Sequence, residues 1–469
     1  MQQFLVRQII APLLERMLGR RTFRNLAELE RQQWWSGKQI RDLQRRKLRE
    51  LLEGAGSASY YARLFAERGL NPRIDDPFMV LRALPLLDKE TIRTYLDEMT
   101  NVAVPGGVRS FNTGGSTGQP LTFFIDRRRV GYDKAARMLT HGWFGARPGD
   151  RELYLWGSPI ELTGQDEIKR WRDWLTNELL LDAFDLSAAS MDAYIERIRR
   201  FDPVSIFGYP SSLVMLAEYA ESQGLSLANR SLKAVFVTGE QLDCHQRQTL
   251  EGHFEAPVAN GYGSRDGGFI AHECERGAMH VIEPNIIIEI VDEDGDTAPA
   301  GAVGEIVITH LDAHATPFIR YRTGDMGRLV DDRCRCGRLL ACLDVSAGRK
   351  TDHLVAADGK LEHALAAIYV LREMPTVGRF RIHQHRDLRV DVEVVAVGRF
   401  GSADRERIVR GLQRRLGATI PVSVNVVDAI ACTGSGKFRQ VVSEAVGHFS
   451  PAEKVDWVME EHTQELQAV

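Results

Sequence analysis

Long apolar runs are missing from this sequence. No stretch of about eighteen or more apolar residues occurs in the 469-residue chain, which argues against a membrane-spanning helix. The N-terminus also lacks the uninterrupted apolar core of a secretory signal peptide, so we expect a cytoplasmic protein without a transmembrane segment. Hydrophobic residues nevertheless make up 44% of the chain, which is ample for two or three globular domains.

Excess charge of either sign is also small. The 60 lysines and arginines are nearly balanced by 64 aspartates and glutamates, giving a formal net charge of −4. The basic residues are scattered along the chain, whereas a nucleic-acid-binding domain gathers them on one face. We therefore expect no nucleic-acid partner.

Cysteine is scarce, and its six residues are spaced too unevenly for the disulfide framework of a secreted protein. Cys334 and Cys336 stand two apart beside a glycine, and His272, Cys274 and His280 precede them. Thiolates and imidazoles in this mixture suit tetrahedral zinc. A Cys-x-Cys spacing is weaker evidence than Cys-x-x-Cys, so spacing alone leaves zinc open but favours plain buried thiols.

Internal repeats are absent, and the apolar pattern changes along the chain. In residues 1–100 the apolar residues mostly recur with the period of an α-helix. Beyond them, short runs rich in branched residues alternate with helical stretches, which is typical of an α/β sheet domain. Residues 285–311 predict two strands around an acidic glycine turn, a local β-subdomain. After Gly348 the pattern predicts a compact α+β unit whose helix spans 402–416.

The first 21 residues have the pattern of an amphipathic helix. Such a helix could rest on an anionic membrane surface, but packing on its own protein or on a sister subunit is the commoner outcome, and a homodimer stays open. Pro12 is expected to interrupt a long interfacial helix. The apolar stripe consists of Phe4, Leu5, Ile9, Ile10, Leu13, Leu14, Met17 and Leu18.

The stretch FNTGGSTGQPL, Phe111 to Leu121, sets three glycines among hydroxylated side chains. Glycine lets a loop turn several N–H groups toward one point, so this loop could hold a phosphate. The same composition also makes ordinary surface turns, and taken alone it favours a turn. A Walker-type loop is excluded, because no Gly-x-x-x-x-Gly-Lys-Ser/Thr pattern occurs.

Four further motifs follow the glycine loop in order: NGYGSRDGG, FIRYRTGDMGRL, SAGRKTDHL and CTGSGKFRQ. Together the five motifs resemble the adenylate-forming superfamily of acyl-CoA synthetases and related ligases. Within it, the chain most resembles the phenylacetate–CoA ligase branch with its capsule-biosynthesis-cluster relatives. The resemblance covers roughly residues 30–446, and five motifs in order are far more specific than any one of them.

This resemblance implies an α/β protein with a large N-terminal adenylation domain that includes a β-subdomain, and a small α+β C-terminal lid domain. With the apolar pattern it divides the chain into a helical part of the large domain (1–100), the adenylation core with its β-subdomain (101–347), a mobile lid (348–446) and a helical tail (447–469).

In the glycine loop, the resemblance assigns ATP phosphate binding to hydroxyl groups and backbone N–H donors. The residues concerned are Thr113, Gly114, Gly115, Ser116, Thr117 and Gly118. Gln119 stands where many members carry lysine, and this departure removes one positive charge from the loop.

In NGYGSRDGG, Tyr262 matches the aromatic residue that stacks on adenine. Asp266 falls where the family usually has a glutamate that helps to hold Mg²⁺, and its shorter arm could act through water or a shifted loop. Further contacts with the nucleotide or the substrate are expected from Gly239, Glu240, Gly261, Gly263 and Ser264.

The later motifs match residues with separate tasks in the family. Asp325 matches the aspartate that accepts both ribose hydroxyls, and Arg349 matches an arginine that contacts the ribose or a phosphate. Lys437 matches the catalytic lysine of the lid, because its Gly-Ser-Gly lead places one cation on a mobile tip. Asp352 matches the interdomain hinge.

Some members of this branch carry a structural zinc between the segment after the adenine-binding tyrosine and the cysteine pair before the hinge. The resemblance therefore implies Cys274, His280, Cys334 and Cys336 as zinc ligands, with His272 and Cys342 as reserves. A closed four-ligand site would pin the β-subdomain rather than perform chemistry.

Together these matches imply an ATP- and Mg²⁺-dependent ligase that forms an acyl-adenylate and then a thioester with coenzyme A. Transfer to an amine or sugar amine is one alternative, and a non-catalytic nucleotide-binding protein on the same fold is another. The substrate is a small carboxylate, and Trp156, Tyr209 and Phe236 favour an aromatic or apolar acid, although these are also ordinary core residues.

Overall fold

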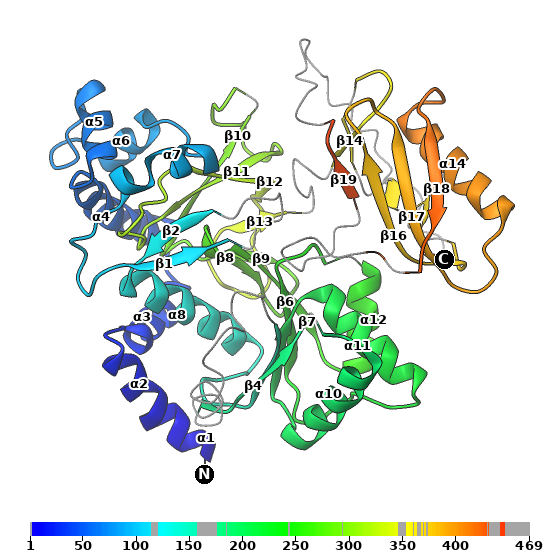
Figure 1. The fold of residues 1–469 in the computed structure, drawn as a ribbon. Coiled ribbons are helices and arrows are strands. Elements are labelled where there is room, and N and C mark those ends of the chain that lie inside the picture. Colours follow the sequence, from blue (N-terminus) through cyan, green and yellow to red (C-terminus); the bar gives the residue numbers. More distant parts are fainter. Residues whose placement is uncertain are drawn as a thin grey trace. The chain divides into compact units, whose positions relative to one another are not determined.

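The computed structural model describes residues 2–113, 121–156, 176–183, 185–242, 244–292, 294–345, 353–359, 361–363, 367–368, 370–371, 374–428, 430 and 441–445. The chain forms two compact units, and the boundary between them in the sequence follows residue 348. The first unit runs from blue to yellow-green in Figure 1, and the second runs from yellow to red.

Helices account for most of the first hundred residues, as predicted. Ser36 caps α4 and forms a capping box with Gln39, while Asp76 and Asp88 cap α6 and α7. The helices of the first unit are α1 (Gln2–Leu5), the π-helix η1 (Val6–Ile10), α2 (Ala11–Met17), α3 (Thr22–Gln32), α4 (Gly37–Ala55), α5 (Ser59–Glu67), α6 (Pro77–Ala83), α7 (Lys89–Met99), α8 (Arg127–Trp143), α10 (Ala188–Phe201), α11 (Pro210–Ser222) and α12 (Cys244–Phe254).

An eleven-stranded sheet forms the centre of the first unit, in the order β10-β11-β12-β13-β9-β8-β7-β6-β5-β3-β4. Strands β4, β3, β5, β6 and β7 are parallel neighbours, and the others pair in antiparallel fashion. The strands are β3 (Glu152–Trp156), β4 (Glu178–Asp182), β5 (Ser205–Gly208), β6 (Ala234–Thr238), β7 (Val258–Ser264), β8 (Gly268–Glu273), β9 (Met279–Val281), β10 (Ile286–Val291), β11 (Gly304–His310), β12 (Tyr321–Val330) and β13 (Cys342–Asp344). A separate hairpin pairs β1 (Arg109–Asn112) with β2 (Thr122–Ile125).

Helices cover both faces of the parallel strands, which explains their continuous apolar runs. On β6, Val235 and Val237 share a buried cluster with α10, α11 and α12, which lie together on one side of the sheet in Figure 1. Phe236 points the other way, and its ring stacks on His141 of α8 at 3.7 Å between centroids. The predicted alternation of strand and helix is therefore confirmed.

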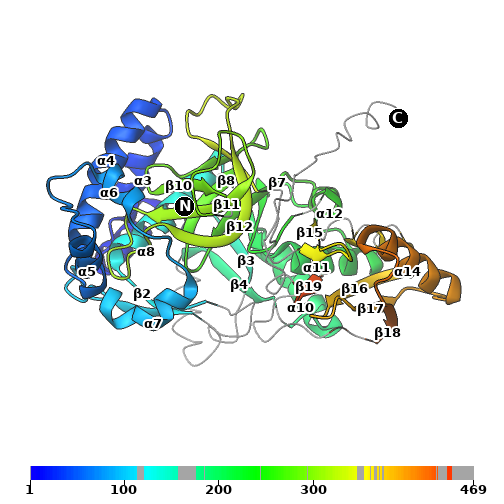
Figure 2. The same cartoon turned by 90° about the horizontal axis from the view of Figure 1, so that it is seen from above.

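A second core joins the N-terminal helices to the antiparallel strands. Leu48 of α4 and Ile92 of α7 share one buried cluster with Ile286 of β10 and Ile308 of β11. Figure 2 shows α4 and α6 beside β10 and β11. Strands β10 and β11 pair as the two predicted strands of the β-subdomain.

The N-terminal segment differs from the prediction in two respects. Pro12 does not break the helix, because η1 precedes α2 and lets the chain continue from Gln2 to Met17. The segment also packs through Val6 and Glu15, while most of the predicted apolar stripe faces outward. No helix among the described residues is long and apolar enough to cross a membrane.

The second unit contains a four-stranded sheet in the order β18-β17-β16-β19. Ile408 and Leu412 of α14 pack in one core with Ile382 and Val392, and Figure 2 shows α14 beside this sheet. The predicted strands and helix of this unit are confirmed. Its elements are β14 (His353–Val355), β15 (Leu361–His363), β16 (Val377–Gln384), β17 (Val390–Ala396), α14 (Ser402–Leu416), β18 (Val422–Val426) and β19 (Val441–Ser443).

Candidate functional site

The carboxyl ends of parallel strands meet at one edge of the sheet, where open α/β proteins bind their ligands. Trp156 ends β3, and Thr238 ends β6 and leads into Gly239 and Glu240. Tyr262 lies near the end of β7, one strand further along. The topology therefore brings three motifs that are far apart in the sequence to the same edge.

The central pair of predicted site residues is Tyr262 and Asp325. The Tyr262 hydroxyl donates a hydrogen bond to Asp325 Oδ2 at 2.8 Å and lies 3.4 Å from Thr323 Oγ1. Thr323 accepts a hydrogen bond from the Asp325 amide (3.1 Å) and donates to the Ile306 carbonyl (2.8 Å). The aromatic ring and the carboxylate are thus fixed relative to each other, an arrangement that suits a ribose beside a purine base.

Glu240 and the predicted glycines have structural partners at this edge. The Glu240 carboxylate accepts a hydrogen bond from the Ser211 amide at the N-terminus of α11 (3.1 Å). Gly261 accepts the Thr238 hydroxyl on its carbonyl (2.7 Å), which ties the end of β6 to β7. A Cβ atom on Gly263 would lie 2.5 Å from the carbonyl oxygen of Gly268, so only glycine fits there.

The glycine loop is closed at its base by the β1–β2 hairpin. The Thr113 amide donates to the Leu121 carbonyl (2.9 Å), and the Leu121 amide donates to Thr113 Oγ1 (2.9 Å). Thr113 therefore keeps its hydroxyl hydrogen for another acceptor. Arg265, next to the predicted Asp266, donates to the Asn112 carbonyl (3.1 Å) and so holds β1 beside the turn after β7.

Asp266 is buried in that turn and is 5% exposed. Its carboxylate accepts hydrogen bonds from the Tyr321 hydroxyl and the Gly267 amide and lies 3.8 Å from Lys89 Nζ. Burial opposes its ionisation, but Lys89 and hydrogen bonds from Ser264 and Tyr321 outweigh burial and hold the pKa of Asp266 below its usual value. Each oxygen has an internal partner, and the carboxylate keeps a further lone pair, so the predicted magnesium contact stays a prediction.

Sequence reasoning did not identify the residues that hold this turn. Arg129 of α8 donates to the carbonyl oxygens of Arg265 (2.9 Å) and Asp266 (2.6 Å), and Lys89 begins α7. These side chains come from helices more than 130 residues upstream. No local motif marks them, and only the fold brings them to the turn.

Several predicted site residues lie outside the described residues, and their roles stay predictions. They are Gly114, Gly115, Ser116, Thr117, Gly118, Gln119, Arg349, Asp352 and Lys437.

Two of the three aromatic residues predicted for the substrate lie at the carboxyl edge. The Trp156 ring stacks on Tyr209 at 4.1 Å between centroids with an interplanar angle of 18°. Phe236 is fully buried against α8 and belongs to the core.

Comparison with known proteins finds matches over most of the chain. The AMP-binding enzyme model matches residues 179–311, and the CapK C-terminal domain model matches residues 354–444. A phenylacetate-coenzyme A ligase of Thermus thermophilus is 26% identical over 435 residues, which cover 86% of this chain and 96% of that protein. Protein CapK of Staphylococcus aureus is 24% identical over 257 residues, covering 54% of this chain and 55% of that protein. The crystal structure of 2-hydroxyisobutyryl-CoA ligase in the postadenylation state matches with a TM-score of 0.68 at 20% identity, covering 88% of this chain and 91% of that chain.

The chain resembles the adenylate-forming ligases. The matches support the branch of phenylacetate–CoA ligases and CapK, as its motifs predict. The structural match confirms the predicted fold class, a mixed α/β protein with a large sheet and a separate small C-terminal α/β domain. These matches are to enzymes and support an AMP-forming ligase.

The ligase also gathers the four predicted zinc ligands. One ligand atom from each of Cys274, His280, Cys334 and Cys336 lies within 4.8 Å of the others. Cys274 Sγ is 3.6 Å from Cys334 Sγ, and Cys336 Sγ is 3.2 Å from His280 Nε2. The two segments meet because β9 pairs with both β8 and β13.

Contacts around these four residues orient them as a metal site requires. His280 Nδ1 lies 3.0 Å from the Leu340 carbonyl and donates to it, which leaves the Nε2 lone pair facing Cys336. Backbone N–H groups donate to Cys274 Sγ and Cys334 Sγ, both at 3.4 Å. The two reserve ligands have other contacts. His272 Nδ1 donates a hydrogen bond to the Glu273 carbonyl (2.7 Å), and Cys342 Sγ lies 3.7 Å from His280 Nδ1, on the side of the ring away from Cys336.

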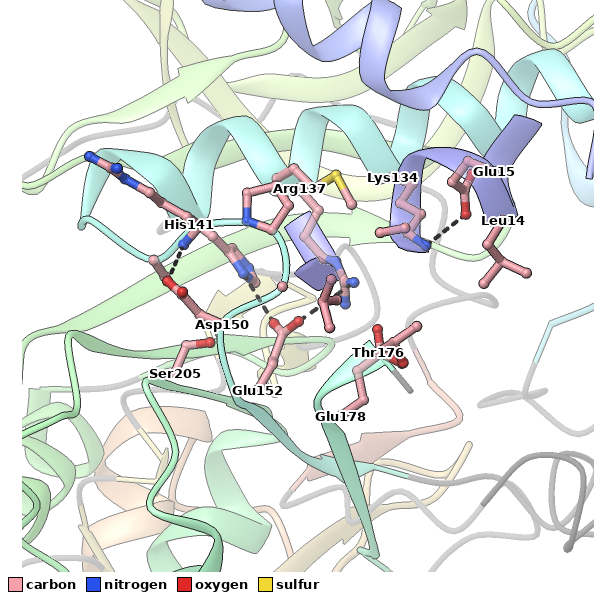
Figure 3. Close-up of a pocket in the computed structure, with 17 residues that line it drawn as sticks. Leu14, Glu15, Lys134, Arg137, His141, Asp150, Glu152, Thr176, Glu178 and Ser205 are labelled. Carbon is pink, nitrogen blue, oxygen red and sulfur yellow. Dashed lines mark hydrogen bonds and ion pairs between the residues drawn. The ribbon is translucent and has the colours of Figure 1, made fainter. Parts of the chain in front are cut away.

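A small pocket lies at the opposite, amino-terminal edge of the ligase's parallel strands (Figure 3). Its volume of about 60 Å³ has room for a few waters and is too small for a nucleotide. Glu152 and Ser205, the first residues of β3 and β5, face Arg137 and His141 of α8 across it. We regard it as a buried ionic cluster rather than a substrate site.

Proposed function

We propose that this ligase activates a small carboxylic acid with ATP and then passes the acyl group to the thiol of coenzyme A. A carboxylate oxygen attacks the α-phosphorus of ATP, the bond to pyrophosphate breaks, and an acyl-adenylate remains. The sulfur of coenzyme A, after losing its proton, then attacks the acyl carbon, and AMP leaves. Similarity to phenylacetate-coenzyme A ligase supports the thioester step.

The observation that carries the proposal is the Tyr262–Asp325 pair at the carboxyl edge of the sheet. A carboxylate has acceptor oxygens for ribose hydroxyls, and the Tyr262 ring offers a flat face to adenine. We propose that the glycine loop, including the Thr113 hydroxyl, binds the phosphates. Lys437 would neutralise charge as pyrophosphate leaves, because catalysis of this transfer consists mainly of positioning and charge neutralisation.

ATP-dependent reactions of this kind imply Mg²⁺, which neutralises phosphate charge when bound. Asp266, the residue predicted to hold it, accepts hydrogen bonds from Tyr321 and Gly267, and its carboxylate has further lone pairs. Asp266 would hold the ion directly or through a water molecule, and we assign no step to the ion itself.

The thiol and imidazole cluster fits a different metal. We propose that Cys274, His280, Cys334 and Cys336 hold one structural Zn²⁺, because three sulfurs and one oriented imidazole nitrogen are a donor set for tetrahedral zinc. A bound zinc ion would join the β8–β9 turn to the segment before β13 and add to the free energy of unfolding.

We propose an aromatic or apolar acid as the substrate class. The stacked Trp156 and Tyr209 rings at the carboxyl edge support this choice. Phe236 no longer contributes to it, since its ring is buried against α8.

An amine or sugar amine is the second candidate acceptor. An amide bond synthetase of Marinactinospora thermotolerans shares the fold, with a TM-score of 0.50 at 21% identity, which supports keeping this alternative. A non-catalytic nucleotide-binding role is the third candidate, and retention of Asp325 and Lys437 argues against it.

A panel of carboxylic acids scored by pyrophosphate release tests the proposal. Each acid is assayed alone, with coenzyme A, with hydroxylamine and with amine acceptors. Release that depends on an apolar acid, with thioester formed only when coenzyme A is present, is the expected result. Amide products without thioester would select the second candidate, and no pyrophosphate release with any acid would contradict the ligase proposal.

Lys437→Ala tests the assignment of the catalytic lysine. We expect adenylation to fall by about a hundredfold or more, because one preorganised charge in the transition state is lost, while ATP binding is largely kept. Lys233→Ala, a lysine beside β6 with its side chain outside the site motifs, is the matched control. Pyrophosphate release within about threefold of wild type would refute the assignment.

A further inference from the structure

We propose that His383, His385 and Glu444 form a second metal site, on the sheet of the C-terminal unit, for a divalent transition-metal ion. One ligand atom from each of these side chains lies within 4.8 Å of the others. The cluster lies wholly within the second unit, apart from the residues of the cysteine site.

Strand geometry places these side chains on one face. Ile382 and Gln384 of β16 are completely buried, so the alternating residues His383 and His385 point to the other face. Asp391 of β17 stands directly opposite His383 in the register, on the same face. Glu444 follows β19, whose parallel register with β16 sets Ser443 beside Gln384.

Two of the three side chains in the cluster are already in contact. His383 Nε2 lies 2.9 Å from Glu444 Oε1, and the two imidazole centroids are 4.4 Å apart. The three side chains are 34%, 25% and 44% exposed for His383, His385 and Glu444, so an ion can enter from solvent. An ion would lie between His383 and Glu444 in place of their direct contact.

A surrounding carboxylate orients the second imidazole. His385 Nε2 lies 2.7 Å from Asp391 Oδ2, and Asp391 Oδ1 accepts the Ser423 hydroxyl at 2.6 Å. With its Nε2–H donated to Asp391, His385 presents Nδ1 as the ligand nitrogen. Two imidazoles and a carboxylate suit Zn²⁺, Ni²⁺, Cu²⁺ or Co²⁺ rather than Mg²⁺ or Ca²⁺.

The position of Glu444 gives this ion a consequence for the proposed reaction. Strand β19 begins at Val441, four residues after Lys437 in the sequence. An ion that joins Glu444 to β16 would fix the end of the segment that carries the lysine. This consequence rests on the proposed function, whereas ion binding itself does not.

Cobalt titration of the full chain tests the site. In the Cys334→Ser/Cys336→Ser background, we expect about one Co²⁺ per chain with visible d–d bands and no thiolate charge-transfer band. Adding His383→Asn and His385→Asn should weaken this binding at least about tenfold. Unchanged cobalt affinity in the histidine variants, or no cobalt bound in the cysteine background, would overturn the proposal.

Matched controls come from the same surface and from another histidine. Glu393→Gln removes a carboxylate that faces Arg381 (3.6 Å), and His253→Asn removes a histidine that faces Glu221 (3.5 Å). Both should leave cobalt binding unchanged. Hydrogen exchange at residues 441–445 should slow when cobalt binds, and Glu444→Gln should abolish that change even if the histidine variants fold poorly.

A different observation concerns the N-terminal helices. Six large apolar side chains along α1, η1, α2 and the residue after them face solvent on a protein whose other apolar residues are mostly buried. Their exposed fractions are 65% for Phe4, 42% for Leu5, 54% for Ile9, 55% for Leu13, 76% for Met17 and 42% for Leu18. We propose that this N-terminal face docks on the surface of an anionic lipid bilayer.

The charges around the face select a lipid surface over a second copy of the chain. Arg16, Arg21 and Arg127 are exposed, and Arg127 reaches Gly19 at the end of the segment. The only acidic residue in the first 21 is Glu15, which is 2% exposed and hydrogen-bonded to Thr22 and Lys134. The same segment of a second copy would therefore present arginines and no exposed carboxylate to these arginines. Anionic lipid presents phosphates, which are the complementary charge.

The extent of the face also fits a surface helix. A stable dimer buries about 800 Å² on each partner, and six half-exposed side chains at roughly 100 Å² each supply less. An interfacial helix needs only an apolar face with basic flanks, and the attraction to anionic lipid adds to apolar burial.

Vesicle sedimentation of the full chain tests this docking. The protein should bind vesicles of phosphatidylcholine with about a third phosphatidylglycerol, bind pure phosphatidylcholine weakly, and lose anionic binding as salt rises. Ile9→Ser/Leu13→Ser/Met17→Ser should weaken anionic binding at least about tenfold. Ile74→Ser/Val303→Ser, which removes two exposed apolar residues elsewhere, should not. Absence of vesicle binding, or a dimer that the triple variant turns into a monomer, would overturn the proposal.

Discussion

At the scale of single residues, the proposed nucleotide site depends on the hydroxyl group of Tyr262. The Tyr262 hydroxyl donates to Asp325 at 2.8 Å and holds the carboxylate in place. Tyr262→Phe should raise the KM for ATP about tenfold, because a hydrogen bond to a charged group is lost. It should change kcat by less than about threefold, since the aromatic ring stays. Steady-state kinetics of pyrophosphate release measures both constants.

A surface tyrosine provides the matched control for that experiment. The Tyr219 hydroxyl donates to Asp192 at 2.8 Å on an exposed part of α11. Tyr219→Phe removes the same group from a similar partner and should leave the KM for ATP unchanged. Equal KM values for the Tyr262 and Tyr219 variants would show that the Tyr262–Asp325 contact does not serve ATP.

A second residue-scale feature is the buried carboxylate of Glu152. It accepts the Tyr154 hydroxyl and faces His141 Nδ1 at 3.2 Å and Arg137 Nη2 at 3.8 Å. Burial opposes its ionisation, but Arg137 and hydrogen bonds from His141 and Tyr154 outweigh burial and lower the pKa of Glu152 to about 2. Because this pKa lies below the unfolded value of 4.5, the folded chain binds fewer protons there than the unfolded chain.

Glu152 should therefore stabilise the fold above about pH 4.5, and this contribution should be lost as the pH falls toward about 2. Glu152→Gln should lower the free energy of unfolding near pH 7 by about 3 kcal/mol, since Arg137 loses its buried partner. The variant should also flatten the decline of stability below pH 4.5. Urea unfolding across this range measures both effects, and Glu196→Gln, in an exposed pair with Arg200, should change neither. If the free energy of unfolding of the variant declines below pH 4.5 as steeply as that of wild type, the role of Glu152 is contradicted.

At the scale of elements, the thiol cluster joins strands of the β-subdomain. Purified protein should contain about one zinc per chain, and Cys334→Ser/Cys336→Ser should release it and lower the melting temperature, because structural metal adds folding energy. Elemental analysis and thermal melting check these outcomes. Cys244→Ser, at an exposed free cysteine, is the control and should keep the metal. Metal-free protein prepared without chelators would favour plain buried thiols.

Most helices and strands were predicted from the sequence, because apolar periodicity and capping residues are local features of the chain. The apolar runs of β3, β5 and β6 lie between helical periods, and capping residues such as Ser36 and Asp88 precede α4 and α7. The order of the strands had no such signal. Strand β9 lies between β8 and β13, although β13 comes four strands later in the chain, and this pairing is what brings Cys274 near Cys334.

The sequence motifs predicted the residues of the candidate site that contact one another. They did not predict the residues from distant helices that hold these motif residues in place. Tyr262 and Asp325 belong to separate motifs, and the fold pairs them as the resemblance implies. Of the internal partners of Asp266, Lys89 lies in no motif, and Tyr321 lies in the motif FIRYRTGDMGRL but was given no role there, so the burial of this carboxylate was not foreseen. The exposure of the apolar side chains in the N-terminal helices was also not predicted. The apolar stripe alone does not show whether these side chains pack on the rest of the protein or face solvent.

At the scale of the whole molecule, the proposed reaction needs a change between its two steps. One site must first use Lys437 for adenylation and then admit the acyl acceptor, so the lid must turn about a hinge. The boundary between the two compact units follows residue 348, close in sequence to the predicted hinge residue Asp352. We expect Asp352→Pro to hold one lid orientation, because proline fixes φ and removes an N–H.

The hinge variant should then separate the two half-reactions. It should retain one of them and lose most of the other, for example forming adenylate from ATP and acid while failing to deliver the acyl group. Adenylate formation and thioester formation are measured separately by pyrophosphate release and by coenzyme A consumption. Asp352→Ala removes the same carboxylate without fixing φ, so it should slow both steps far less than proline does. If Asp352→Pro lowers both steps equally while its melting temperature matches wild type, Asp352 only marks the boundary between two units, and the two-state lid does not apply to this chain.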